Sequence, residues 1–171
     1  MAKKIKETKK EREKHLKEER QKEEKQEKIR QQRYIVEREK EIREVIAAQF
    51  AEQSVITESS DEARELYNKS AYGKLTDDGR VQLSLIEAFY LLQKGKIRIY
   101  KNKREINLEN LLRAAKKVEP NFWIRYCVFK DIRDRGYIIK TALKFGADFR
   151  VYERGIKPGE DHAKWIVYPV Y

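Results

Sequence analysis

Cysteine is nearly absent from this sequence. Cys127 is the only cysteine among 171 residues, so the chain cannot form an internal disulfide bond. Its neighbours Tyr126, Val128 and Phe129 are all aromatic or aliphatic. This apolar setting predicts a buried thiol that packs in a core rather than a reactive nucleophile.

Long hydrophobic runs are missing as well. No apolar stretch approaches the ~20 residues that a membrane-spanning helix needs, and no apolar segment of a secretory signal follows the basic start of the chain. The sequence also lacks a glycine-rich phosphate loop, a zinc-ligand cluster and a nucleophile elbow. These absences predict a soluble, cytoplasmic protein without a cofactor or a metal.

Charge, in contrast, is abundant and unbalanced. The chain has 40 Lys and Arg against 29 Asp and Glu, for a formal net charge of +11 and an isoelectric point of about 9.6. A surplus of this size suits a polyanionic partner, either a nucleic acid or an acidic membrane surface. Composition alone does not distinguish the two.

Residues 1–33 consist almost wholly of Lys, Glu, Arg and Gln, and neither Gly nor Pro interrupts them. Their apolar residues are too sparse for a coiled-coil seam, while oppositely charged residues four positions apart would support an exposed helix. These pairs include Glu13–Lys17, Glu18–Lys22 and Glu24–Lys28. We interpret the segment as a solvated helix or a disordered tail. The alternative is a basic arm on RNA phosphates, although the interleaved acidic residues weaken its field.

Apolar residues become frequent after residue 34. Ile35, Ile42, Val45 and Ile46 fall near one helical face, which predicts that the helix continues to about residue 50 and docks there. The segment 54–60 breaks this pattern and is typical of a linker or a short strand. We therefore predict a charged helical extension over residues 1–54.

A first compact domain is predicted over residues 55–118. Ser84 and Glu87 have the spacing of a capping box at the start of an apolar helix, and Gly95 is placed to end it. The other expected elements are a short helix beginning at 59–62, a strand at 97–100 and a helix beginning at Asn107.

A second domain is predicted over residues 119–171. Residues 121–135 are apolar on most sides, which predicts a buried helix that ends at Gly136. Three strands should follow it. Their expected bounds are 137–141, 148–153 and 163–170, with a polar loop at 157–161.

Several short motifs in this second domain occur in a characteristic order. Arg-Gly-Tyr, Lys-Thr, Phe-Gly-Ala-Asp-Phe and Tyr-Glu-Arg-Gly follow one another between residues 135 and 155, and Asp161-His162-Ala163-Lys164 comes next. The segment resembles the catalytic domain of the archaeal tRNA-splicing endonucleases (tRNA-intron lyases). Together with Leu66-Tyr67, Tyr72-Gly73 and Leu83-Ser84-Leu85, the resemblance covers roughly residues 60–171. It implies an α+β fold with a mixed sheet flanked by helices.

The resemblance also implies a chemistry and its residues. Tyr152 would be the base that takes the 2′-hydroxyl proton, and His162 the acid that protonates the leaving 5′-oxygen. The reaction would be metal-independent, giving a 2′,3′-cyclic phosphate and a 5′-hydroxyl. The substrate would be precursor tRNA with bulge-helix-bulge introns, cut by an oligomer that this chain forms with itself or with a paralogous subunit.

Physical chemistry sets conditions on these roles. Free tyrosine has a pKa of about 10, so its use as a base at neutral pH requires neighbouring cations. Histidine titrates near 6.5 and can supply a proton at neutral pH. The cations near Tyr152 in sequence are Arg150, Arg154, Lys157 and Lys164.

Two alternatives stay open at this point. The family's third catalytic residue, a Lys, is expected beyond Tyr171, so we expect the chain to hold only the first part of the catalytic domain. Three explanations fit this expectation: a truncated gene product, one piece of a split enzyme, and a non-catalytic structural or RNA-binding subunit. The second alternative is a metal-dependent nuclease, although the spacing of its candidate residues fits no tight motif. Those candidates are Asp148, Glu160, Asp161 and Lys164.

Overall fold

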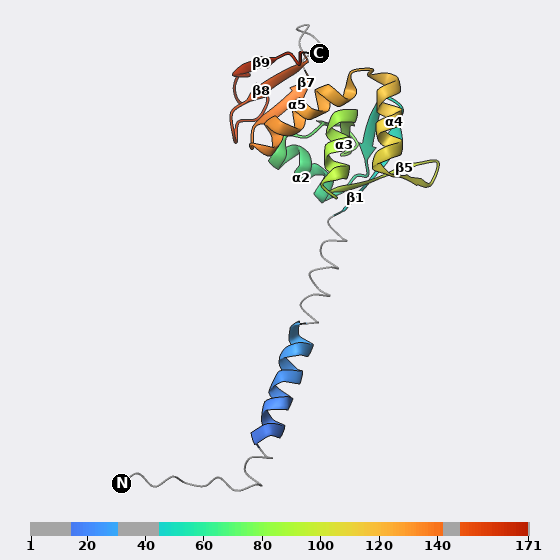
Figure 1. Ribbon diagram of the computed structural model, residues 1–171. Helices are drawn as coiled ribbons and strands as arrows, with labels where there is room; N and C mark the ends of the chain where they lie inside the picture. The colour runs from blue at the N-terminus through green and yellow to red at the C-terminus, as the bar shows by residue number, and fades with distance from the viewer. Residues whose placement is uncertain (1–14, 31–44, 142–147, 171) are drawn as a thin grey trace. The chain divides into compact units, whose positions relative to one another are not determined.

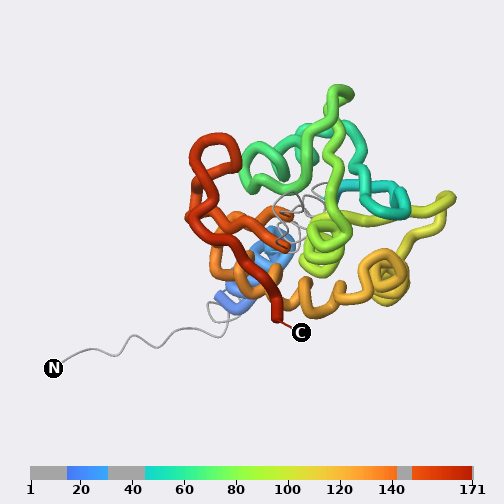
Figure 2. The backbone as a smooth tube through the Cα atoms, turned by 90° about the horizontal axis from the view of Figure 1, so that it is seen from above, coloured from blue at the N-terminus to red at the C-terminus, as the bar shows by residue number. Residues whose placement is uncertain are grey.

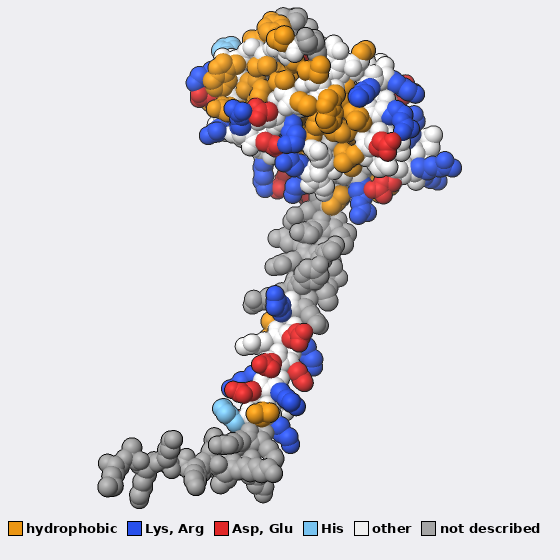
Figure 3. Space-filling model, viewed as in Figure 1, with side chains coloured by type: hydrophobic (Ala, Val, Ile, Leu, Met, Phe, Trp, Pro, Cys, Tyr) orange, Lys and Arg blue, Asp and Glu red, His pale blue; other side chains and the backbone are white. Residues whose placement is uncertain are grey.

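The computed structural model describes residues 15–30, 45–141 and 148–170 (Figure 1). The chain divides into two units, Met1–Arg43 and Glu44–Tyr171. In the first unit, residues 15–30 form a helix on which every residue is exposed, as we predicted for a solvated helix. Acidic and basic side chains alternate around it (Figure 3). The remainder of the predicted extension up to residue 44 lies outside the described residues.

The predicted helix does not continue through residues 46–50. Ile46–Ala51 form the strand β1 instead, so this prediction was wrong. Ile46 and Ala48 are buried while Gln49 is exposed, an alternation with the period of a strand. The spacing of these apolar residues also fits a helix. The strand forms because it pairs with two neighbouring strands.

The second unit contains a six-stranded sheet in the order β3-β4-β2-β1-β5-β6. β1 runs parallel to β5, with Ile46 opposite Ile97, and the other neighbours are antiparallel. The strands that join β1 are β2 (Ser54–Thr57), β3 (Lys74–Leu75), β4 (Val81–Ser84), β5 (Ile97–Lys101) and β6 (Arg104–Ile106). One face of this sheet is buried. Its apolar residues include Ile46, Val55, Val81, Leu83, Ile97 and Ile99.

Two helices are capped as the sequence predicts. The Ser84–Glu87 capping box begins α3 (Leu85–Gln93), and Asn107 caps α4 (Leu108–Val118). Gly95 follows α3 with φ +68°, the left-handed conformation expected just past a helix end. Nearly all of α3 is buried, and it packs against α4 and the next helix (Figure 2). The remaining helices are α2 (Asp61–Ser70) and α5 (Phe122–Asp134).

Helix α5 has one buried face rather than being buried on most sides. Phe122, Tyr126 and Phe129 recur every three or four residues and are at most 2 % exposed. Cys127 lies on the opposite side and is exposed, so the predicted buried thiol was wrong. Its apolar sequence neighbours misled the prediction because consecutive residues on a helix point in different directions.

A second, three-stranded sheet follows in the order β7-β8-β9, with both pairs antiparallel. β7 (Ile138–Thr141), β8 (Phe149–Tyr152) and β9 (Trp165–Val167) confirm the three predicted strands with shorter bounds. Helix α5 joins this sheet to the rest of the core, because Phe129 contacts Phe149 while Tyr126 contacts Phe89 of α3. The α+β fold class is confirmed, and the parallel strand pair within the described residues belongs to the six-stranded sheet.

Candidate functional site

Strand β8 presents Tyr152 at its carboxyl end. The side chain is 4 % exposed and forms a small cluster with Ile138, its partner on β7, and Ala71 at the end of α2. Ala163, from the segment before β9, packs against the same cluster. The ring of Tyr152 is therefore held between β7, the end of α2 and the segment before β9.

His162 lies in the loop that connects β8 to β9 and is exposed. Its backbone N–H donates to the Asp161 carboxylate at 2.6 Å. Two residues on, the Lys164 N–H donates to the Val151 carbonyl at 2.9 Å, which returns the loop to β8. These bonds fix the backbone on either side of His162.

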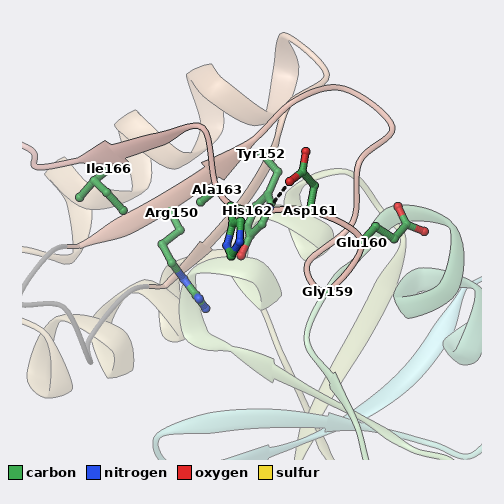
Figure 4. Close-up of a pocket in the computed structure, with 8 residues that line it drawn as sticks. All are labelled: Arg150, Tyr152, Gly159, Glu160, Asp161, His162, Ala163 and Ile166. Carbon is green, nitrogen blue, oxygen red and sulfur yellow. Dashed lines mark hydrogen bonds between the residues drawn. The ribbon is translucent and has the colours of Figure 1, made fainter.

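Tyr152 and His162 line the same open cavity of about 510 Å³ (Figure 4). The sequence suggested that the two residues would meet if their strands were adjacent, and β8 and β9 are indeed paired. The cavity combines a phenol, an imidazole, a guanidinium and carboxylates. Its other lining residues are Arg150, Gly159, Glu160, Asp161, Ala163 and Ile166.

Of the four cations that the sequence places near Tyr152, Arg150 is the one that lines the cavity. Arg154 lies over the Tyr137 ring and donates to the Arg135 carbonyl at 2.9 Å. Lys164 forms an ion pair with Glu153. The sequence analysis did not predict which of these four cations would line the cavity. The period of the strand was the available signal, because residues 150 and 152 share one face of β8.

The carboxylates of the metal alternative are not brought together. Asp148 forms an ion pair with Arg125 at 2.6 Å, while Glu160 and Asp161 lie at the cavity. Within residues 15–30, 45–141 and 148–170, no three His, Cys, Asp or Glu side chains form a group suited to a metal ion. The donor set predicted for a metal-dependent nuclease is therefore dispersed.

A buried ion pair supports the wall behind the cavity. Lys140 of β7 contacts Glu87 of α3 at 2.9 Å and also donates to the Gly73 carbonyl at 2.8 Å. Glu87 accepts further bonds from the N–H groups of Gly73 and Ser84. Burial alone would raise the pKa of Glu87, but the Lys140 charge and these N–H donors outweigh it and hold that pKa below its ordinary value.

The ion pair joins β7 and α3 to the segment between α2 and β3. Gly73 follows the turn that carries Ala71, and Lys140 lies two residues from Ile138 on the same face of β7. Glu87 thus ties together the two segments that contact the Tyr152 ring. A side chain could not replace the hydrogen of Gly73, because a Cβ there would lie 2.5 Å from the Gln82 carbonyl oxygen.

Comparison with known proteins agrees with this architecture. Residues 46–112 match the family model of the tRNA intron endonuclease N-terminal domain, and residues 122–171 match that of the tRNA intron endonuclease catalytic C-terminal domain. The chain belongs to the tRNA intron endonuclease family. Both Tyr152 and His162 fall within the catalytic-domain match, and residues 1–45 lie outside both matches.

Curated relatives support the same assignment. The tRNA-splicing endonuclease of Thermococcus onnurineus is 39 % identical over 129 residues, which are 75 % of this chain and 73 % of the relative. That of Methanothermobacter thermautotrophicus is 41 % identical over 122 residues, or 71 % of this chain and 70 % of the relative. Among the described residues of this family member, no helix is long and apolar enough to cross a membrane.

Proposed function

We propose that this chain is a tRNA-splicing endonuclease subunit that cleaves introns from precursor tRNA at bulge-helix-bulge structures. The observation that carries the proposal is the shared cavity of Tyr152 and His162, within the region that matches the family's catalytic domain. The relatives, which are named tRNA-splicing endonucleases, supply the substrate class. The net charge of +11 suits RNA.

The reaction we propose is an internal transfer that needs no metal ion. Tyr152 takes the proton of the 2′-hydroxyl, and the 2′-oxygen attacks the adjacent phosphorus. The bond from phosphorus to the 5′-oxygen breaks as His162 donates a proton to that oxygen. The products are a 2′,3′-cyclic phosphate and a 5′-hydroxyl, so the atoms balance without water.

Arg150 supplies the positive charge that such a site requires. The pentacoordinate transition state carries more negative charge on its phosphoryl oxygens than the starting diester, so a fixed cation stabilises it selectively. Arg150 is half-buried and lines the cavity that holds both proposed catalytic residues (Figure 4).

A cleavage assay tests the proposal. The protein is incubated with a bulge-helix-bulge RNA in EDTA, and the ends of the products are identified by their response to phosphatase and kinase. We expect cleavage that EDTA leaves unchanged, with cyclic-phosphate and 5′-hydroxyl ends. Loss of cleavage in EDTA would contradict the metal-free reaction. Binding without cleavage would favour the non-catalytic, RNA-binding subunit.

We also propose that the active form is an oligomer, of this chain or with a paralogous subunit, in the cytoplasm. Exposed apolar residues in and after β9, an edge of the described three-stranded sheet, support this proposal because such groups are costly to leave in water. Their exposed fractions are 42 % for Trp165, 46 % for Ile166, 58 % for Tyr168 and 91 % for Val170. Light scattering of the purified protein measures the stoichiometry, and a monomer at assay concentrations would contradict self-association.

A further inference from the structure

The β5–β6 hairpin and the turn before it form the most one-sided charge cluster in the second unit. Residues 94–104 contain six Lys and Arg and no Asp or Glu. No acidic residue occurs anywhere between Glu87 and Glu105. The cations of this basic hairpin are Lys94, Lys96, Arg98, Lys101, Lys103 and Arg104, and all six are exposed.

Most of this charge is not neutralised by neighbouring carboxylates. Lys94 pairs with Asp134 at 3.0 Å, and Arg98 approaches Glu105 only at 4.0 Å. Lys101 lies over the Phe50 ring. Lys103 and Arg104, by contrast, have no ion-pair partner among the described residues. Exposed cations elsewhere in the unit do form ion pairs, as Lys69 does with Glu65.

The backbone presents these cations on a fixed turn. Lys101 pairs with Arg104, so Asn102 and Lys103 form a two-residue connection. Their φ angles are +49° and +64°, the sign pattern of the tight hairpin turn that matches the twist of paired strands. Basic side chains project at the tip (Figure 3). A polyanion therefore meets a preformed surface and does not have to order a loop.

The hairpin lies far from the candidate site. It projects from the side of the second unit opposite β8 and β9, in both Figure 1 and Figure 2. A ligand that reaches both places must be extended and anionic along its length. Precursor tRNA satisfies both conditions, whereas a short RNA limited to the cleavage site satisfies only the second.

We propose that the basic hairpin binds the phosphate backbone of the precursor RNA at a position remote from the cleavage site. The inference rests on the proposed function, since it takes the same RNA as its ligand. Phosphate contacts of this kind fix the register of an RNA on a protein without reading its bases. The hairpin thus contributes affinity for long substrates and adds nothing to the chemical step.

The test compares two RNAs and two double variants. Lys103→Gln with Arg104→Gln removes two cations that have no ion-pair partner among the described residues and leaves a neutral, polar side chain at each position. The matched control, Lys69→Gln with Arg113→Gln, removes two exposed cations that are paired with Glu65 and Glu109. Each protein is titrated at several salt concentrations with a full-length precursor tRNA and with a minimal bulge-helix-bulge RNA. Circular dichroism checks that both variants are folded.

For the hairpin variant we expect weaker binding of the full-length precursor, with a salt slope reduced by roughly 1 to 2, about one unit per lost phosphate contact. Binding of the minimal RNA and the cleavage rate at saturation should match the wild type. Equal losses in both double variants would overturn the inference, because they would report net charge alone. Equal losses on both RNAs would overturn it as well, because the contact would then not be remote from the cleavage site. A wild-type protein that cleaves neither RNA would contradict the proposed function instead.

Discussion

At the scale of single residues, the proposed reaction depends on two side chains. Tyr152→Phe removes only a hydroxyl, and His162→Ala removes an exposed imidazole. Each should lower the single-turnover cleavage rate by roughly 10²–10⁴-fold, the usual range for general acid–base groups. The matched controls, Tyr67→Phe on α2 outside the cavity and His15→Ala in the first unit, should cleave at the wild-type rate. Near-normal rates in both site variants would remove the catalytic assignment.

Glu87 gives a residue-scale prediction about stability. Glu87→Gln leaves Lys140, whose side chain is 18 % exposed, without its carboxylate partner. Breaking a buried pair in this way should destabilise the fold by about 3–5 kcal/mol near neutral pH. Glu109→Gln, which breaks an exposed pair with Arg113, should leave the denaturant midpoint almost unchanged.

The pH dependence of that effect has a definite sign. Because the folded state holds the pKa of Glu87 below its ordinary value, the folded protein gains stability from the ionised carboxylate. This gain is complete above the unfolded pKa, near 4.5, and is lost as the pH falls through the folded value. The free-energy difference between wild type and Glu87→Gln should therefore shrink below about pH 4.5. A constant difference from pH 7 to pH 3 would show that Glu87 does not carry it.

At the scale of elements, α3 connects the two sheets. Phe89 contacts Phe122 and Tyr126 of α5 at ring-centroid distances of 5.7 and 4.7 Å. Phe89→Ala should cost about 3–5 kcal/mol through the cavity it leaves. Ile124→Ala, on the exposed face of α5, should cost far less. Fluorescence of Trp123 and Trp165, together with circular dichroism, should still report one unfolding transition, and separate transitions would show that the sheets unfold independently.

Elements also show how far the sequence alone reaches. The Ser84–Glu87 capping box and the strands of the second sheet were predictable because their signals are local. β1 was not, since its residues also fit a helix and only the distant strands β2 and β5 select the sheet. The same limit holds at the site. The family resemblance pointed to Tyr152 and His162, whereas the support from Glu87 and Lys140 joins residues 53 positions apart and leaves no local pattern.

At the scale of the whole molecule, the two units have different roles. Residues 15–30 are exposed on every side, so the second unit should fold without the first. Deleting residues 1–33 should leave the thermal midpoint of the second unit nearly unchanged. The deletion also removes the basic start of the chain, in which Glu7 is the only acidic residue among the first ten. If that segment touches RNA, binding should weaken equally for all RNA sequences and the salt slope should flatten slightly.

The contribution of residues 1–33 to RNA binding can be separated from that of the basic hairpin by combining the deletion with the hairpin variant. Independent contacts with phosphates should add, so the deletion together with Lys103→Gln and Arg104→Gln should reduce the salt slope by the sum of the separate effects. We expect the hairpin to account for the larger share, because Lys103 and Arg104 have no ion-pair partner among the described residues and lie on a fixed turn, while the cations of residues 1–33 are interleaved with carboxylates. Titrations of the four proteins with full-length precursor tRNA measure this. Identical slopes for the deleted and the intact chain would leave residues 1–33 without a role in RNA binding.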